Sequence, residues 1–148
     1  MIASADDCGL DGPIEHWRQV RDEIHADVCA RGFDPVSNSF VQYYGAQGTD
    51  AALLLMPIVG FLPVDDPRVA GTIARIEREL LRDGLVYRYL GDQQVDGVPG
   101  SEGAFLACSF WLCDAYIAAG QRGEAQALFE HLLTLATILI FSLKNTIR

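Results

Sequence analysis

The chain has 148 residues, of which half are hydrophobic and 21% are charged, so one modest folded domain is expected. Its formal net charge of −9 at pH 7, with eleven scattered Lys and Arg residues, leaves no basic surface for phosphates and argues against a nucleic-acid partner. The two longest apolar stretches begin at Ala51 and Leu132. Both are shorter than the roughly 20 residues of a bilayer-spanning helix, so no membrane association is expected.

The cysteine and histidine spacings do not predict a metal centre. The four cysteines include no Cys-x-x-Cys pair, and the three histidines lack the helical spacing of zinc ligands. The N-terminal segment carries early acidic residues and no apolar core of signal-peptide length. We therefore expect no metal, no cofactor and a reduced, cytoplasmic protein.

The first helix is expected to run from Pro13 to about Arg31-Gly32, with Asp11 capping its first turn. Its predicted apolar face comprises Ile14, Trp17, Val20, Ile24 and Val28.

Residues 34–59 combine turns with one apolar run. Turns are expected at 34–35 and 37–38, followed by a short extended segment over 40–44. Residues 51–59 are apolar all round, which predicts a buried helix that Pro57 stops or kinks.

The next helix has the clearest boundaries, with Asp66 as cap, Pro67 at the first position and Gly84 after the last turn. Its expected core stripe is Val69, Ile73, Ile76 and Leu80. A solvated side is predicted for Arg68, Arg75, Glu77, Arg78 and Arg82.

Two further helices are expected on either side of Gly120, which would stop the first and allow a tight antiparallel hairpin. The first is lined by Phe105, Leu106, Leu112, Cys113 and Tyr116, and the second by Ala125, Leu128, Leu132 and Leu135. Every long element is thus helical. The pattern favours an all-α protein with short extended segments in its loops.

A cluster of chemically capable side chains falls between the third predicted helix and the hairpin, within sixteen positions. It consists of Tyr87, Arg88, Tyr89, Asp92, Asp96 and Glu102. Arginine, aromatic rings and carboxylates are groups that bind sugars. The alternative is structural: the aspartates would be turn residues, the tyrosines would cover the core, and Glu102 would favour a helix N-terminus through the macrodipole.

Several long strings resemble glycoside hydrolase family 15, the glucoamylase-like enzymes that include some bacterial trehalases. They are "FVQYYGAQGTDAALLLMPIVGFLPVDDPRV", "GLVYRY", "DGVPGSEGAFLACSFWLCDAYIAAG" and "EAQALFEHLLTLA", in consistent order. The resemblance implies a partial (α/α)6 toroid over residues 1–136 and an enzyme that releases glucose from an α-glucoside with inversion. Residues 137–148 are predicted to be an off-family tail.

Inversion requires two carboxyl groups, one acting as acid and one as base, roughly 6.5–9.5 Å apart. The resemblance implies that the acid precedes the chain and that the base follows the segment resembling "EAQALFEHLLTLA". No catalytic residue is therefore assigned within the chain.

The resemblance does imply substrate-binding residues. Arg88 is expected to reach sugar hydroxyls, with Tyr89 beside it, and Glu102 is expected to position substrate at the pocket edge. Asp92 is a weaker candidate because it lies in a loop of variable length. Two other positions have structural explanations: Asp50 as a helix cap, and Trp111 as a core residue.

The favoured interpretation is a fragment of an inverting α-glucoside hydrolase, acting on an α-glucoside or trehalose-type sugar and inactive alone. A noncatalytic helical binding or interaction module with the same fold is the alternative. A third possibility is activity with Glu102 as base. Helix faces that a complete toroid would bury are expected to favour self-association or aggregation.

Overall fold

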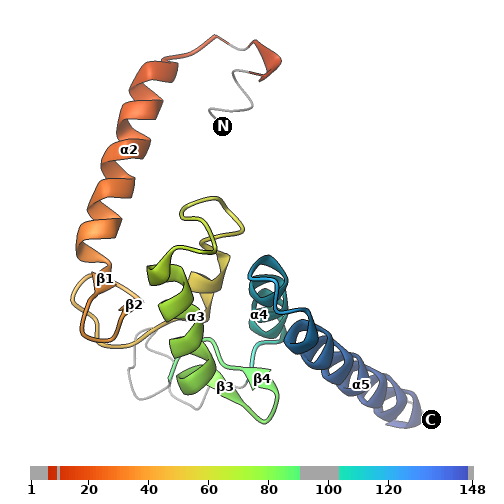
Figure 1. Cartoon of the computed structure of the whole chain (residues 1–148). Coiled ribbons are helices and arrows are strands. Elements are labelled where there is room, and N and C mark those ends of the chain that lie inside the picture. Colours follow the sequence, from red (N-terminus) through yellow and green to blue (C-terminus); the bar gives the residue numbers. More distant parts are fainter. Residues whose placement is uncertain (1–6, 10, 91–103, 147–148) are drawn as a thin grey trace.

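The computed structural model describes residues 7–9, 11–90 and 104–146, with side chains described as far as residue 138. The described chain consists of α-helices, one short 3-10 helix and two small β-hairpins, so the all-α prediction is confirmed (Figure 1). Helix α3 (Pro67–Leu80) lies centrally, with the first hairpin (residues 33–40) on one side and α4 (Leu106–Ala118) on the other (Figure 1). Helices α2 (Ile14–Arg31) and α5 (Arg122–Thr146) extend away from this centre (Figure 1).

Helix α2 spans Ile14–Arg31, as predicted, but it begins differently and buries less. Pro13 is the N-cap residue and no side chain caps the helix, so the capping role predicted for Asp11 is wrong. None of its residues is fully buried, and Ile24 is 57% exposed. The apolar side chains predicted for this face are present, but little of the described chain packs against them.

The first hairpin pairs β1 (Phe33–Asp34) with β2 (Ser39–Phe40) in antiparallel register. Its turn is organised by Asp34, whose carboxylate accepts hydrogen bonds from the Ser37 hydroxyl (2.7 Å) and from the backbone N–H of Val36 (3.0 Å). These bonds, led by that of Ser37, hold the pKa of Asp34 below its usual value. The turn predicted at 34–38 is therefore present.

The helix in the apolar segment after this hairpin is shorter than predicted. It is the 3-10 helix η1 (Ala51–Leu55), which begins where Asp50 accepts a hydrogen bond from Ala52 N–H (2.8 Å). The chain then turns through Pro57 and Gly60, which has a φ of +73°. Val59 is consequently 72% exposed, so the prediction of a buried helix over 51–59 is wrong for its second half.

Helix α3 spans Pro67–Leu80 and starts as predicted, with Asp66 accepting a hydrogen bond from Arg68 N–H (2.9 Å). The four residues of the predicted stripe are all buried: Val69, Ile73, Ile76 and Leu80. Gly84 does not end this helix. It lies instead in the turn between β3 (Leu81–Arg82) and β4 (Leu85–Val86), where its φ of +75° suits glycine.

Helices α4 (Leu106–Ala118) and α5 (Arg122–Thr146) form the predicted helical hairpin around Gly120, whose φ is +77°. The rings of Phe110 and Phe129 meet across it with centroids 6.2 Å apart. Phe105 is 55% exposed and Leu106 is 41% exposed, so their predicted place on the buried face is wrong.

The core lies where α3, η1, β4, α4 and the first half of α5 meet. Its largest fully buried side chains include Phe40, Leu54, Ile76, Leu80, Leu112 and Leu132. Within the described residues, no helix has both the length and the apolar character that crossing a bilayer requires.

Candidate functional site

The segment that carries the predicted sugar-binding residues is anchored by its backbone. Val86 N–H donates to the buried hydroxyl of Ser109 on α4 (2.9 Å). Tyr87 N–H donates to the carbonyl of Leu80, the last residue of α3 (2.9 Å). The second hairpin therefore places the chain after β4 at a fixed point beside both helices.

Arg88 is tied to a third element, the start of η1. Its carbonyl oxygen accepts a hydrogen bond from Ala51 N–H (2.8 Å), and its Nε lies 3.8 Å from Oδ2 of Asp50. The Arg88 side chain is 53% exposed, and its guanidinium carbon lies 5.8 Å from the centre of the Tyr89 ring. A fixed backbone thus presents a solvent-accessible guanidinium group next to an aromatic face, and both can contact a sugar.

The two carboxylate oxygens of Asp50 contact different groups. One carboxylate oxygen caps η1, as the sequence predicted, and the other faces Arg88. The Asp50 side chain is 11% exposed, which keeps this carboxylate close to the arginine and largely away from solvent. The ion pair connects positions 38 residues apart, which sequence spacing alone did not indicate.

The loop before Asp50 is held by Arg75, a buried arginine of α3. Its guanidinium donates to the Ser37 hydroxyl (2.9 Å), to the carbonyl of Gln47, and to Glu79 (3.1 Å). The prediction that Arg75 lies on the solvated side of the helix is wrong, because only 8% of its side chain is exposed. The available signal was its position one residue before Ile76, at the edge of the apolar stripe.

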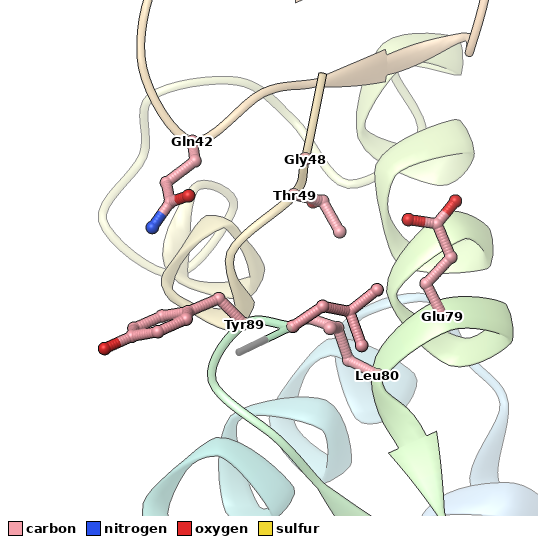
Figure 2. Close-up of a pocket in the computed structure, with 7 residues that line it drawn as sticks. Gln42, Gly48, Thr49, Glu79, Leu80 and Tyr89 are labelled. Carbon is pink, nitrogen blue, oxygen red and sulfur yellow. The ribbon is translucent and has the colours of Figure 1, made fainter. Parts of the chain in front are cut away.

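A small cavity lies between this loop, α3 and the segment after Arg88 (Figure 2). It has a volume of about 40 Å³ and is lined by Gln42, Gly48, Thr49, Glu79, Leu80, Tyr89 and Leu90. Thr49 and Glu79 lie on opposite sides of it, while the Tyr89 ring extends away from Glu79 (Figure 2). Sequence reasoning identified Tyr89 among these residues and missed the polar residues Gln42, Thr49 and Glu79.

The remaining predicted site residues have mixed outcomes. Asp92 and Glu102, together with Asp96 of the same cluster, lie outside the described residues, so their predicted roles stay predictions. Trp111 is partly buried against the core, with its ring centroid 6.4 Å from that of Phe105, which agrees with the core interpretation.

The described residues do not bring together three His, Cys, Asp or Glu side chains in an arrangement that could hold a metal ion. The described side chains of the site offer hydrogen bonding and ring contact. Arg88 offers guanidinium N–H donors, Tyr89 offers an aromatic face, and the flanking carboxylate of Asp50 accepts.

The sequence model described as "Glycosyl hydrolases family 15" matches residues 1–142. The chain belongs to glycosyl hydrolase family 15. The family resemblance carried by the four long strings is thereby confirmed. The match extends past residue 136, and α5 also crosses this position without a break. Neither observation tests where the family segment ends, so the off-family tail over 137–148 stays a prediction.

Curated relatives that resemble the chain are named trehalases. A trehalase from Thermoplasma acidophilum is 45% identical over 132 residues, which is 89% of this chain and 22% of the relative. A trehalase from Mycobacterium tuberculosis is 45% identical over 126 residues, which is 85% of this chain and 18% of the relative. The chain thus spans about a fifth of the length of these relatives.

Solved structures of glycosidases agree with the fold. A glycosidase variant in complex with glucose matches with a TM-score of 0.70 and 26% identity, covering 84% of this chain and 33% of that one. A wild-type glycosidase matches with a TM-score of 0.67 and 27% identity, covering 78% of this chain and 30% of that one. The helices described above are therefore part of an (α/α)6 toroid, as the family resemblance implied.

Proposed function

We propose that the chain forms a sugar-binding wall of an inverting α-glucoside hydrolase of trehalase type, with Arg88 as its principal binding residue. The observation that carries the proposal is the presentation of Arg88. Its side chain is half exposed while its backbone is bonded to η1, in a chain 45% identical to trehalases. A positioned guanidinium group can direct several N–H donors at sugar hydroxyls.

The catalytic acid and base are proposed to lie on segments outside this chain. An inverting enzyme needs both carboxyl groups, separated by roughly 6.5–9.5 Å across the scissile bond. Within the described part of the site, Asp50 is engaged by η1 and Arg88, and Glu79 by Arg75 and Arg78. These carboxylates are occupied in holding the wall together, which supports a binding role for the chain and an inactive protein when it is alone.

Trehalose is the proposed substrate. The support is the name shared by the curated relatives and the glucose bound to the structural neighbour. Because the same chemistry serves other α-glucosides, maltose is the appropriate comparison substrate.

The experiment is a glucose-release assay on two proteins. One is this chain alone, and the other is the Thermoplasma acidophilum trehalase in which residues 9–136 of this chain replace the matching segment. We expect no glucose from the chain alone and trehalose hydrolysis by the chimera. Arg88→Ala in the chimera should lower kcat/KM by about 10²-fold or more, as loss of a positioned donor does.

The matched control is Arg82→Ala, which removes an exposed arginine from the hairpin that precedes Arg88 and should leave activity unchanged. A chimera that stays fully active with Arg88→Ala would refute the binding role. A folded but inactive chimera would favour the noncatalytic binding module. Glucose release by the chain alone, abolished by Glu102→Gln, would instead establish Glu102 as a catalytic base.

A cytoplasmic location and a tendency to self-associate complete the proposal. Cys29 and Cys113 carry no disulfide, and burial raises the pKa of the Cys113 thiol, which keeps it protonated and unreactive. The exposed apolar side chains of α2 and of the turn at 57–60 support association with a second copy.

A further inference from the structure

The hydroxyl group of Thr49 is buried without a partner. Thr49 is 3% exposed, and its Oγ1 makes no hydrogen bond within the described chain. An unsatisfied buried hydroxyl costs about 1–3 kcal/mol, so such groups in folded proteins are nearly always bonded to protein or to bound water.

Thr49 also lines the 40 Å³ cavity next to Tyr89 (Figure 2). A water molecule needs about 10–15 Å³ of cavity volume, whereas pockets for small organic ligands measure about 300–1,000 Å³. The cavity is therefore large enough for water and too small for a sugar ring.

The polar groups around the cavity select a neutral ligand that can both donate and accept. Glu79 supplies acceptor oxygens, and Gln42 supplies an amide. The Glu79 charge is already balanced by Arg75 and by Arg78, each with a nitrogen 3.1 Å from Oε1. A cation is thus not required, and a carboxylate wall disfavours an anion.

We propose that this cavity binds one ordered water molecule, hydrogen-bonded to Thr49 Oγ1 and to the polar side chains across the cavity. The water links the loop that leads to Asp50 with helix α3. It thereby adds a second connection between these elements to the one that Arg75 makes with the Gln47 carbonyl. The inference does not depend on the proposed hydrolase function, because it concerns the packing of the free protein.

The test is the sign of the stability change in Thr49→Val, which replaces the hydroxyl by a methyl group of similar size. Loss of a water-bonded hydroxyl should lower the midpoint of thermal unfolding by about 2–8 °C. A dry, unsatisfied hydroxyl would give the opposite result, because its removal relieves a penalty. An unchanged or raised midpoint therefore overturns the proposal.

Thr72→Val is the matched control. Thr72 is equally buried, and its Oγ1 accepts from Phe40 N–H (2.9 Å) and donates to the Arg68 carbonyl (2.7 Å). Its removal must lower the midpoint, which calibrates what the loss of a bonded threonine hydroxyl costs in this protein.

A second measurement uses the unsubstituted chain and so does not depend on the folding of a variant. Water–protein NOE spectra should show a long-lived water beside the Thr49 methyl group, and its absence overturns the proposal. Glucose or trehalose added in excess should leave that signal unchanged. Loss of the signal on sugar addition would assign the cavity to a substrate hydroxyl instead of water and would also overturn it.

Discussion

At the scale of single residues, Arg75 links three segments of the site through its hydrogen bonds, which its local sequence does not indicate. Arg75→Met keeps much of the side-chain volume but removes the donors to Ser37 and to the Gln47 carbonyl. We expect a loss of about 2–3 kcal/mol in the free energy of unfolding, because charge-assisted bonds in a buried setting are lost. Urea denaturation measures it.

Arg78→Met provides the comparison. Arg78 contacts the same oxygen of Glu79 at 3.1 Å, but its side chain is 64% exposed. Solvent screens such a pair, so the expected loss is within about 0.5 kcal/mol. Similar losses for the two variants would show that Arg75 acts only through Glu79 and would contradict the clamp on the loop.

At the scale of secondary-structure elements, the start of α3 depends on the charge of Asp66. The side chain of Arg68 and its backbone N–H lower the pKa of Asp66 to about 2. Because the folded-state pKa lies below the unfolded one, this contribution to stability is complete above about pH 4 and is lost as the pH falls toward 2. Asp66→Ala should also cost about 0.5–2 kcal/mol at neutral pH through loss of the cap.

Asp66→Asn separates the contribution of the charge from that of the capping hydrogen bond, because asparagine retains an oxygen acceptor without the charge. The midpoints of thermal unfolding of this variant and of the unsubstituted chain should differ more at pH 5 than at pH 2.5. An equal difference at both values would mean that the ionised form of Asp66 contributes nothing.

Two glycines in helices carry opposite predictions. A Cβ atom at Gly71 would lie 2.1 Å from the carbonyl oxygen of Asn38, whereas one at Gly123 meets nothing within 4 Å. Gly71→Ala should therefore destabilise by about 1–3 kcal/mol, because α3 and the first hairpin must separate. Gly123→Ala should be neutral or stabilise by up to about 1 kcal/mol through helix propensity. Chemical denaturation of both variants checks this, and a stabilising Gly71→Ala would contradict the close approach.

Helix boundaries were predictable from the sequence where local chemistry sets them. Asp66 and Pro67 mark the start of α3, and Gly120 separates α4 from α5, as expected. Gly84 was misassigned because a left-handed glycine suits both a helix end and a hairpin turn. The sequence overestimates the extent of η1 because an apolar run does not distinguish a long helix from a short helix followed by a turn.

At the scale of the whole molecule, the apolar groove between α2 and the 51–61 segment is uncovered in this chain. It has a volume of about 430 Å³, and its lining includes Ile24 and Val59, which are 57% and 72% exposed. We expect concentration-dependent self-association, detectable by sedimentation equilibrium, and expect Ile24→Lys to weaken it. Val36→Lys is the control, since Val36 is 95% exposed in the first hairpin turn. Equal effects of both substitutions would indicate nonspecific association.

The site was predictable in part. Arg88 and Tyr89 are proposed as binding residues because arginine and aromatic residues gather in one short stretch that also resembles the family. The contacts of Arg88 with Asp50 and Ala51, and the burial of Arg75, depend on tertiary packing between segments far apart in sequence. No local periodicity reports such contacts, so the contacts that support the proposed binding residues became visible only in the fold.

The bond between Ala51 N–H and the Arg88 carbonyl has a consequence for biosynthesis. Both partners, and Arg75, which holds the loop before Asp50, belong to the first ninety residues of the chain. The N-terminus of a chain emerges from the ribosome first. Closing a loop of a few tens of residues then carries a modest entropic cost. The scaffold around Arg88 can therefore begin to assemble before α4 and α5 have emerged from the ribosome, and these helices then dock onto a partly formed scaffold.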